Sequence, residues 1–361
     1  MKKLLAFIIF FIVALSVKAE EIVLPSQIGL IKNIDYVEVA NNISEIKQVA
    51  KVEIIKGELK GNEINIDNML TGNPYYDIKL KKGMKVILHV ENIDNELIFS
   101  IADIKRSSAI TWLSLVFCGL LIYVGRRKGI NSLISIGITC LLITNILAPM
   151  ILACINPILA TTLICIASTV LTMYLVGGFN YKSTSAIIGC TLSLLVAYLL
   201  SIITVNFAHL TGYSNENSIF LYTAHPELNF IAITISAIII ATLGAVMDIA
   251  MSIASTINEI YITDNTKTTK ELFISGMNVG RDIIGTMANT LILVYLGSSL
   301  PFLLLASNID FQKFINLNQV VTEISSALIG SSALIICVPI TAIIASNLVK
   351  KSSIKFDKLN I

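Results

Sequence analysis

Ionisable side chains lie inside long apolar runs of the sequence, and these are the side chains best suited to chemistry. Asp248 and Glu259 lie in and just after one run, and Arg281 and Asp282 lie in the next. A charged side chain at the centre of a membrane span costs about 2.5–3.5 kcal/mol on insertion scales, so its presence there indicates a function. These four residues are therefore candidates for a proton, ion or substrate site.

The polar residues of each run share one face of a helix. Spacings of three and four residues return to the same face, and in the first run they connect Asp248, Ser252, Ser255 and Glu259. The same spacings connect the polar residues of the second run, which are Asn278, Arg281, Asp282, Thr286 and Asn289. Polar faces are costly against lipid, so we expect the two stripes to face each other and the interior of a helical bundle.

The favoured interpretation is a path for a small solute, ion or proton. Asp248 and Asp282 would be the proton or cation sites, and Arg281 the counter-charge or anion contact. The polar lining of the path would be Ser252, Asn278 and Asn289. A single structural clamp would not need so many polar positions on one helix.

The alternative interpretation is structural. Arg281 would pair with Asp248 or Glu259 and fix the register of two antiparallel helices, which a connection of about 16 residues makes neighbours. Glycines in the same segments favour close helix packing, namely Gly244, Gly276, Gly280 and Gly285.

Seven apolar runs, within residues 109–348, are long enough to position these stripes in a membrane. A hydrocarbon core of about 30 Å requires about 20 helical residues. The runs are 109–124, 130–150, 157–177, 184–209, 228–257, 274–306 and 324–348.

Basic residues between the runs predict the orientation, because Lys and Arg beside spans are retained in the cytoplasm. One side of the predicted topology carries only Lys313 in its short loops. The other side, which we assign to the cytoplasm together with the basic tail 349–361, carries Arg126, Arg127, Lys128, Lys182, Lys267, Lys270, Lys350, Lys351, Lys355 and Lys358.

The N-terminus predicts export of the segment that follows it. Residues 1–19 have two lysines, an apolar stretch and Val17-Lys18-Ala19, which is typical of a signal peptide, with an uncleaved signal anchor as the alternative. Residues 20–108 alternate apolar and polar residues in short bursts, as in 49–55, 63–66, 76–80 and 85–90, with glycines between them. We expect an extracytoplasmic all-β domain, an OB-like barrel of about five strands.

Composition excludes several classes of protein. The chain has 361 residues, of which 55% are hydrophobic and 14% charged, with a mean hydropathy of +0.80, so a soluble enzyme and a nucleic-acid binder are both disfavoured. The six cysteines lie in apolar runs without metal-ligand spacing. Motifs for ATP hydrolysis and for the commoner hydrolytic reactions are missing from the sequence. We therefore expect no catalytic residues, no metal and no cofactor.

Three segments of the chain resemble the YibE/F family of bacterial membrane proteins. They are residues 243–255 (LGAVMDIAMSIAS), 275–293 (SGMNVGRDIIGTMANTLIL) and 338–342 (VPITA). The resemblance covers residues 109–348 well and the β domain loosely. Because the family is usually described as permeases or transport-related proteins, the resemblance implies transport.

The sequence as a whole predicts an α-helical, multi-pass protein of the cell membrane with an exported β domain. We expect a permease for a small solute or ion, able to form a homo-oligomer or to bind a partner membrane protein. The alternative is a non-transporting envelope scaffold, or partner-binding membrane protein, whose buried charges are structural.

Overall fold

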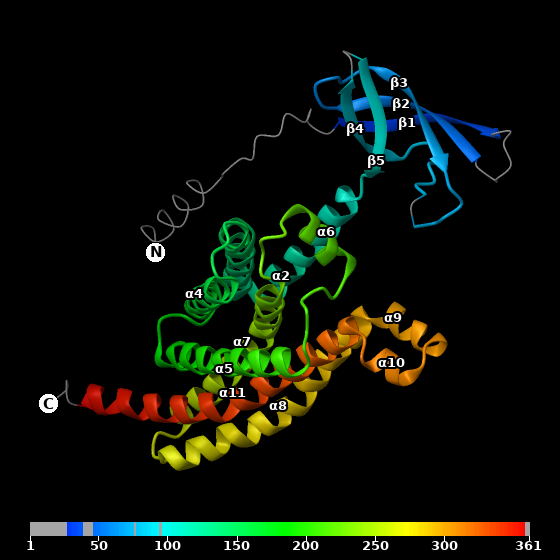
Figure 1. The fold of residues 1–361 in the computed structure, drawn as a ribbon. Helices are drawn as coiled ribbons and strands as arrows, with labels where there is room; N and C mark the ends of the chain where they lie inside the picture. Colours follow the sequence, from blue (N-terminus) through cyan, green and yellow to red (C-terminus); the bar gives the residue numbers. More distant parts are fainter. Residues whose placement is uncertain (1–26, 39–45, 76, 94–95, 358–361) are drawn as a thin grey trace. The chain divides into compact units, whose positions relative to one another are not determined.

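A computed structural model describes residues 27–38, 46–75, 77–93 and 96–357 of the chain (Figure 1). The chain divides into two compact units between Leu120 and Leu121. The predicted signal, residues 1–19, lies outside the described residues, and so do residues 358–361 of the predicted tail.

The first unit contains a five-stranded antiparallel sheet. Its strands are β1 (Gln27–Glu38), β2 (Ile46–Lys56), β3 (Glu63–Leu70), β4 (Lys85–Ile93) and β5 (Glu96–Ile104). They are hydrogen-bonded in the order β3-β2-β1-β4-β5, and the edge strands β3 and β5 approach each other, so the sheet is a nearly closed barrel. Alternate residues such as Ile31, Val52 and Val86 fill its core. The expected barrel of about five strands is confirmed to this extent.

The strand expected over 76–80 is wrong for its described residues, because 77–84 run as an irregular segment. Side chains satisfy the backbone at Ile78 and Leu80, whereas Gly83 and Met84 hydrogen-bond to the backbone of Ile31 in β1. The carbonyl of Ile78 accepts a hydrogen bond from Asn68 at 2.8 Å, and the amide of Leu80 donates to Gln48 Oε1 at 3.1 Å. Leu80 is buried in the barrel, so the segment closes the core without joining the sheet.

The second unit is helical, and the helix that leads into it begins at Ser107 in the first unit. The elements that follow the barrel are α2 (Ser107–Leu142), α3 (Ala148–Leu152), α4 (Pro157–Gly177), α5 (Tyr181–Phe207), α6 (Glu216–Ala224), α7 (Phe230–Thr263), α8 (Thr269–Ser298), α9 (Leu300–Leu305), α10 (Phe311–Ile315) and α11 (Asn318–Asp357). A single π-helical turn, Ile143–Leu147, joins α2 to α3. By length and composition, six of the described helices could cross a membrane.

The first of these six, Ser107–Leu152, contains both of the first two predicted runs. Its backbone is not helical at Arg126, where φ is 48° and ψ is −128°. A Cβ atom on Gly129 would lie 2.1 Å from the carbonyl oxygen of Leu121. Residues eight apart in a straight helix are about 12 Å apart along the axis, so the chain reverses direction here, and glycine permits the close approach.

Asparagine and threonine side chains define where four of the other long helices, α4, α5, α7 and α8, begin. Asn156, Asn180 and Asn229 accept hydrogen bonds from the first backbone amides of α4, α5 and α7. Thr268 and Glu271 form a capping box at the start of α8. The predicted run 274–306 is not a single helix. Helix α8 ends at Ser298, and a separate helix, α9, begins at Leu300.

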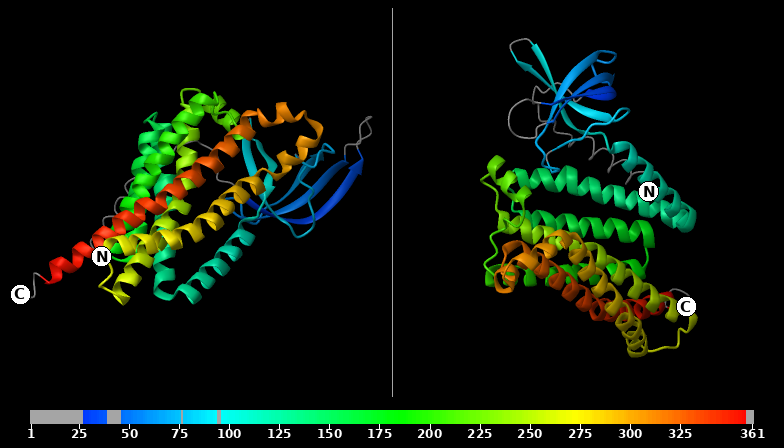
Figure 2. Two further views of the ribbon diagram at one scale, coloured as in Figure 1. Left: turned by 90° about the horizontal axis from the view of Figure 1, so that it is seen from below. Right: turned by 90° about the vertical axis from the view of Figure 1, so that its right-hand side faces the viewer.

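Helices α5, α7 and α11 form the centre of the bundle, and α4 and α8 pack on them (Figures 1 and 2). Small residues allow this close packing: a Cβ on Gly189 of α5 would lie 2.1 Å from Thr341 Oγ1 of α11. We call the two ends of the bundle the α6 end and the 264–268 end, after the loop between α7 and α8. Lys350 donates a hydrogen bond to the carbonyl of Asn265 at 3.2 Å, which places the later part of α11 at the 264–268 end.

Candidate functional site

The polar stripe of α7 lies on the outside of the bundle. Asp248, Ser252 and Glu259 are exposed and Ser255 is half-buried. The Ser252 hydroxyl donates to the backbone carbonyl of Asp248 at 2.8 Å, as helical serines commonly do. The opposite face of α7, including Ile249 and Ile253, is completely buried against the bundle.

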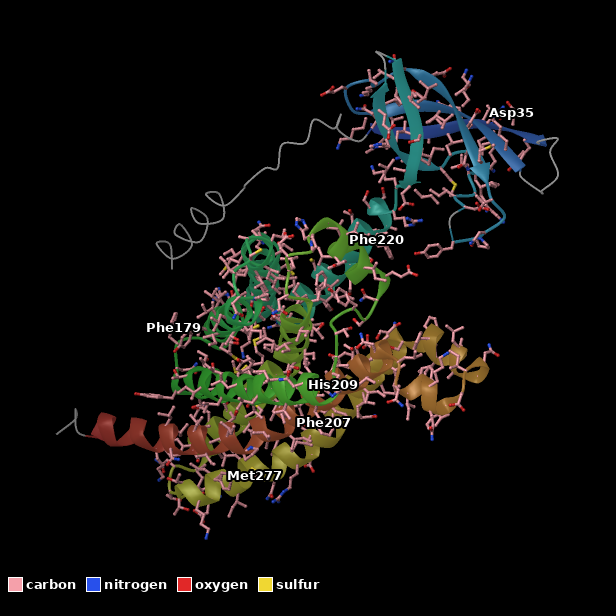
Figure 3. All side chains as sticks on the ribbon, in the orientation of Figure 1. Asp35, Phe179, Phe207, His209, Phe220 and Met277 are labelled. Carbon is pink, nitrogen blue, oxygen red and sulfur yellow. The ribbon has the colours of Figure 1, made fainter. Side chains whose placement is uncertain are left out.

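The polar stripe of α8 is also on the outside. Met277, labelled on α8 in Figure 3, directly precedes this stripe in sequence. Its exposed members are Asn278, Arg281, Asp282, Thr286 and Asn289. The expectation that both stripes face the interior of the bundle is therefore wrong for the single chain.

Glycines explain why α8 turns its polar stripe outward. A Cβ on Gly276 would lie 2.6 Å from Ile257, and one on Gly280 would lie 2.2 Å from Val338. These two glycines bring α8 close to α7 and α11, so the face that carries them is the packing face. Gly244 and Gly285 differ, because a Cβ at either position would have no atom within 4 Å.

The expected ion pair of Arg281 with Asp248 or Glu259 is not among the contacts of the described residues. Arg281 instead donates a hydrogen bond to Asn278 Oδ1, one helical turn earlier, at 3.2 Å. The structural interpretation required a buried pair between helices, and the described residues contain no such pair. The stripes consequently do not fix helix register within one chain.

A cavity of about 360 Å³ lies at the α6 end of the bundle. Its volume is within the range of small-molecule sites. The lining combines apolar residues of α7 with hydroxyl, amide and carboxylate groups. The polar residues that line it are Ser214, Asn215, Asn217, Ser218, Thr234, Tyr295, Thr322, Glu323 and Ser326.

Glu323 is the carboxylate of this cavity. It lies in the first turns of α11, and no Lys, Arg or His among the described residues forms an ion pair with it. A second cavity of about 200 Å³, lined mainly by apolar residues of α8 to α11, also includes Glu323 and Tyr295. The sequence shows Glu323 only as an acid near a helix start, where it favours the helix dipole. The sequence signal that was missed is the position of Ser326, three residues after Glu323 and four after Thr322. This spacing places the three polar residues on one side of the helix.

The wall of the larger cavity continues along α7 into the polar stripe. Successive residues of a helix are about 100° apart around its axis. The α7 residues named in the next two sentences therefore all lie within about 40° of Asp248 around the helix. Thr234, Ala237 and Ala241 line the cavity. The same line continues through Gly244, Asp248, Ser252, Ser255 and Glu259 toward the 264–268 end. This face of α7 thus carries small residues beside the cavity and side-chain oxygens from Asp248 to Glu259.

The polar groups of this arrangement can bind a cation. Carboxylate and hydroxyl oxygens are ligands for small cations and for ammonium groups. Among the described residues no three His, Cys, Asp or Glu side chains cluster as they would around a metal ion. A cation here would be held by one carboxylate and neutral oxygens.

Comparisons with known proteins match both parts of the chain. Residues 113–351 match a family described as YibE/F-like protein, and residues 28–104 match the YibE/F family N-terminal domain. The longer match contains both polar stripes and Glu323, and the shorter match contains the β barrel. The chain matches no curated protein and no solved structure.

Proposed function

We propose, from the premise that this chain belongs to the YibE/F family, that it is a permease for a small cation or a small cationic solute, and not an enzyme. The chain is a membrane protein with several apolar helices. The observation that carries the proposal is the cavity containing Glu323, whose α7 wall continues in helical register to Asp248 and Glu259.

The charge of the cavity supports a cationic solute. Glu323 has no basic ion-pair partner among the described residues, and the other polar side chains that line the cavity carry hydroxyl or amide groups. An uncompensated carboxylate within a span is costly unless it has a positive ligand or takes up a proton. A cation that enters the cavity would supply the missing charge.

The distribution of basic residues supports an orientation. Arg126–Lys128, Lys182, Lys267 and Lys350 all lie at loops or helix ends of the 264–268 end, whereas the α6 end carries Lys313. By the positive-inside rule, the α6 end and its cavity face the outside of the cell membrane. With the reversal of the chain at Arg126, we infer seven crossings, an extracytoplasmic OB-like barrel and a cytoplasmic C-terminus.

A binding experiment tests the cavity. Thermal unfolding of the purified full-length protein is measured with Na⁺, K⁺, Mg²⁺, Ca²⁺, ammonium and spermidine, because a ligand at 100 times its dissociation constant stabilises the native state by about 2.7 kcal/mol. We expect one of these cations to raise the unfolding temperature of the wild type and to have no effect on Glu323→Gln.

Two further variants make the test specific. Glu216→Gln removes an exposed carboxylate at the same end of the bundle that does not line the cavity, so its response should match the wild type. Asp248→Asn should keep the ligand shift but lose uptake of that cation into proteoliposomes. A shift that survives in Glu323→Gln would contradict the assigned site. If no cation binds, and deletion of residues 27–104 alone removes the cellular phenotype, the scaffold alternative is favoured.

A further inference from the structure

The polar face of α8 is left uncovered by the residues that the structure describes. We define this face as Asn278, Arg281, Asp282, Gly285, Thr286 and Asn289, all of which are exposed. In the most apolar 18-residue stretch of α8 only 6% of residues are buried, compared with 56% in both α7 and α11. Helix α8 therefore has one packed side and one open side.

The open side lies at membrane depth. Arg281 is 11 residues from Lys270, which is about 16 Å along the helix. Lipid is a poor neighbour for a guanidinium and a carboxylate at that depth, so these groups pair with each other, with other polar groups or with water. Among the described residues, Arg281 has a side-chain hydrogen bond only with Asn278, and Asp282 has no ion pair.

Arg281 and Asp282 cannot neutralise each other in the same helix, because residues i and i+1 point in different directions. They can do so between two copies. A two-fold axis along the membrane normal places equal depths of the two copies opposite each other, and adjacent residues differ in depth by only about 1.5 Å. Each Arg281 then lies level with the Asp282 of the other copy, and the pairing is reciprocal.

Gly285 is a second, independent observation on the same face. Gly276 and Gly280 are explained by close contacts to α7 and α11, but a Cβ on Gly285 would meet nothing within 4 Å. A glycine in the middle of a helix weakens it relative to alanine. A close approach from outside the chain would account for its presence, as glycines do in membrane helix dimers.

We propose that two copies of this chain associate through the polar face of α8, with Arg281 of each copy forming an ion pair with Asp282 of the other. The faces are self-complementary in charge, and Asn278, Thr286 and Asn289 add hydrogen-bonding groups at the same surface. The inference does not rest on the proposed transport, since a non-transporting scaffold would also need a partner for the polar face of α8.

Charge reversal tests the pairing directly. The full-length protein, in lipid nanodiscs, is assayed by counting subunits per particle and by pull-down between two affinity tags. Arg281→Asp and Asp282→Arg each leave the facing surfaces with charge of one sign, so each should lower self-association by about tenfold or more. The double variant Arg281→Asp/Asp282→Arg should regain wild-type association, because the ion pairs re-form with reversed polarity.

Mixing the two single variants removes the ambiguity of misfolding. Arg281→Asp carries only acidic charge on its face and Asp282→Arg only basic charge, so the two should associate with each other although neither self-associates. Misfolded proteins would not recover in this way. Lys313→Asp, which reverses an exposed charge on α10, is the matched control and should associate as the wild type does.

Cross-linking locates the interface. In a background with Cys118, Cys140 and Cys154 replaced by Ser, Asn289→Cys should form a disulfide-linked dimer on oxidation, whereas Leu163→Cys, 64% exposed on α4, should not. A wild type that is a single subunit in nanodiscs would overturn the proposal and leave a different protein as the cover. Single reversals that self-associate normally, or a mixture that fails to associate, would also overturn it.

Discussion

Carboxylates in this chain differ in what surrounds them, and that difference separates structural from functional ones. The Asp77 carboxylate of the β domain accepts hydrogen bonds from the Thr71 amide at 2.7 Å, the Thr71 hydroxyl at 2.9 Å and the Gly72 amide at 2.8 Å. Glu323 has no comparable set of donors among the described residues, and it faces a cavity. Asp77 therefore holds a turn together, and Glu323 is available to a ligand.

The pH dependence of the β domain should reflect Asp77. Desolvation raises its pKa, but the hydrogen bonds from Thr71 and Gly72 together outweigh it and hold the pKa below its usual value of 3.8. A lowered pKa in the folded state adds stability that is present above the unfolded-state pKa and is lost as pH falls through the folded-state pKa. We expect Asp77→Asn to loosen residues 71–77 at neutral pH, and the difference from the wild type to disappear in acid.

Hydrogen exchange of the full-length protein measures this effect. Comparing wild type and variant at the same pH cancels the intrinsic pH dependence of exchange. Asp67→Asn, which breaks only the exposed ion pair with Lys47, is the control and should leave 71–77 unchanged. Equal protection of 71–77 in the wild type and Asp77→Asn near pH 7 would show that this carboxylate does not hold the turn.

The two sides of helix α8 differ in the residues that they carry. Its inner side has glycines where neighbouring helices approach, and its outer side has charges and Gly285 in open space. Spacing places each set of residues on a face, but only the packing of α7 and α11 decides which face turns inward. The face with the small residues packs inward, because close helix contacts replace lipid contacts with denser packing.

Alanine substitutions should separate the two sides of α8. A Cβ on Gly280 would lie 2.2 Å from Val338 Cγ1, on a short and stiff side chain, so Gly280→Ala should destabilise the protein by about 1–3 kcal/mol through overpacking. Gly285→Ala meets nothing and should leave stability unchanged or slightly raised, since alanine favours helix. Thermal unfolding of both variants in detergent, compared as single subunits, measures the contrast. Equal effects would show that α8 is not packed through Gly280.

At the scale of the whole molecule, the apolar runs predicted the helices well and the stripes predicted their environment poorly. Each long described helix overlaps a predicted run, because a span needs a minimum apolar length whatever its neighbours. The boundaries differ where local chemistry decides them, as at the Thr268 capping box. The rotation of a helix about its axis depends on tertiary contacts, so the outward position of Asp248 and Arg281 could not be read from spacing. The cavity is built by four separate helices, α6, α7, α8 and α11, and a loop, so it had no local sequence pattern beyond that around Glu323.

Surface labelling should establish which end of the bundle faces outward. In the same Cys-to-Ser background, Lys313→Cys at the α6 end should react with a membrane-impermeant maleimide on intact cells. Lys182→Cys, beside the start of α5, should react only after the membrane is permeabilised. Lys60→Cys, exposed in the β domain, should behave as Lys313→Cys does. Labelling in the opposite pattern would invert the proposed topology.

The central place of α11 has a consequence for how the protein is made. Its Ala333, Leu334 and Val338 are completely buried among the earlier helices, yet it leaves the ribosome after all of them. Chains fold from the N-terminus during synthesis. Helices α5 and α7 are therefore in the membrane before α11, which packs against both of them, has been made. A chain cut short before Asn318 would leave Gly189 and Thr242, which lie beside α11, without cover. Quality-control proteases should therefore remove C-terminally truncated chains far faster than chains that lack the β domain.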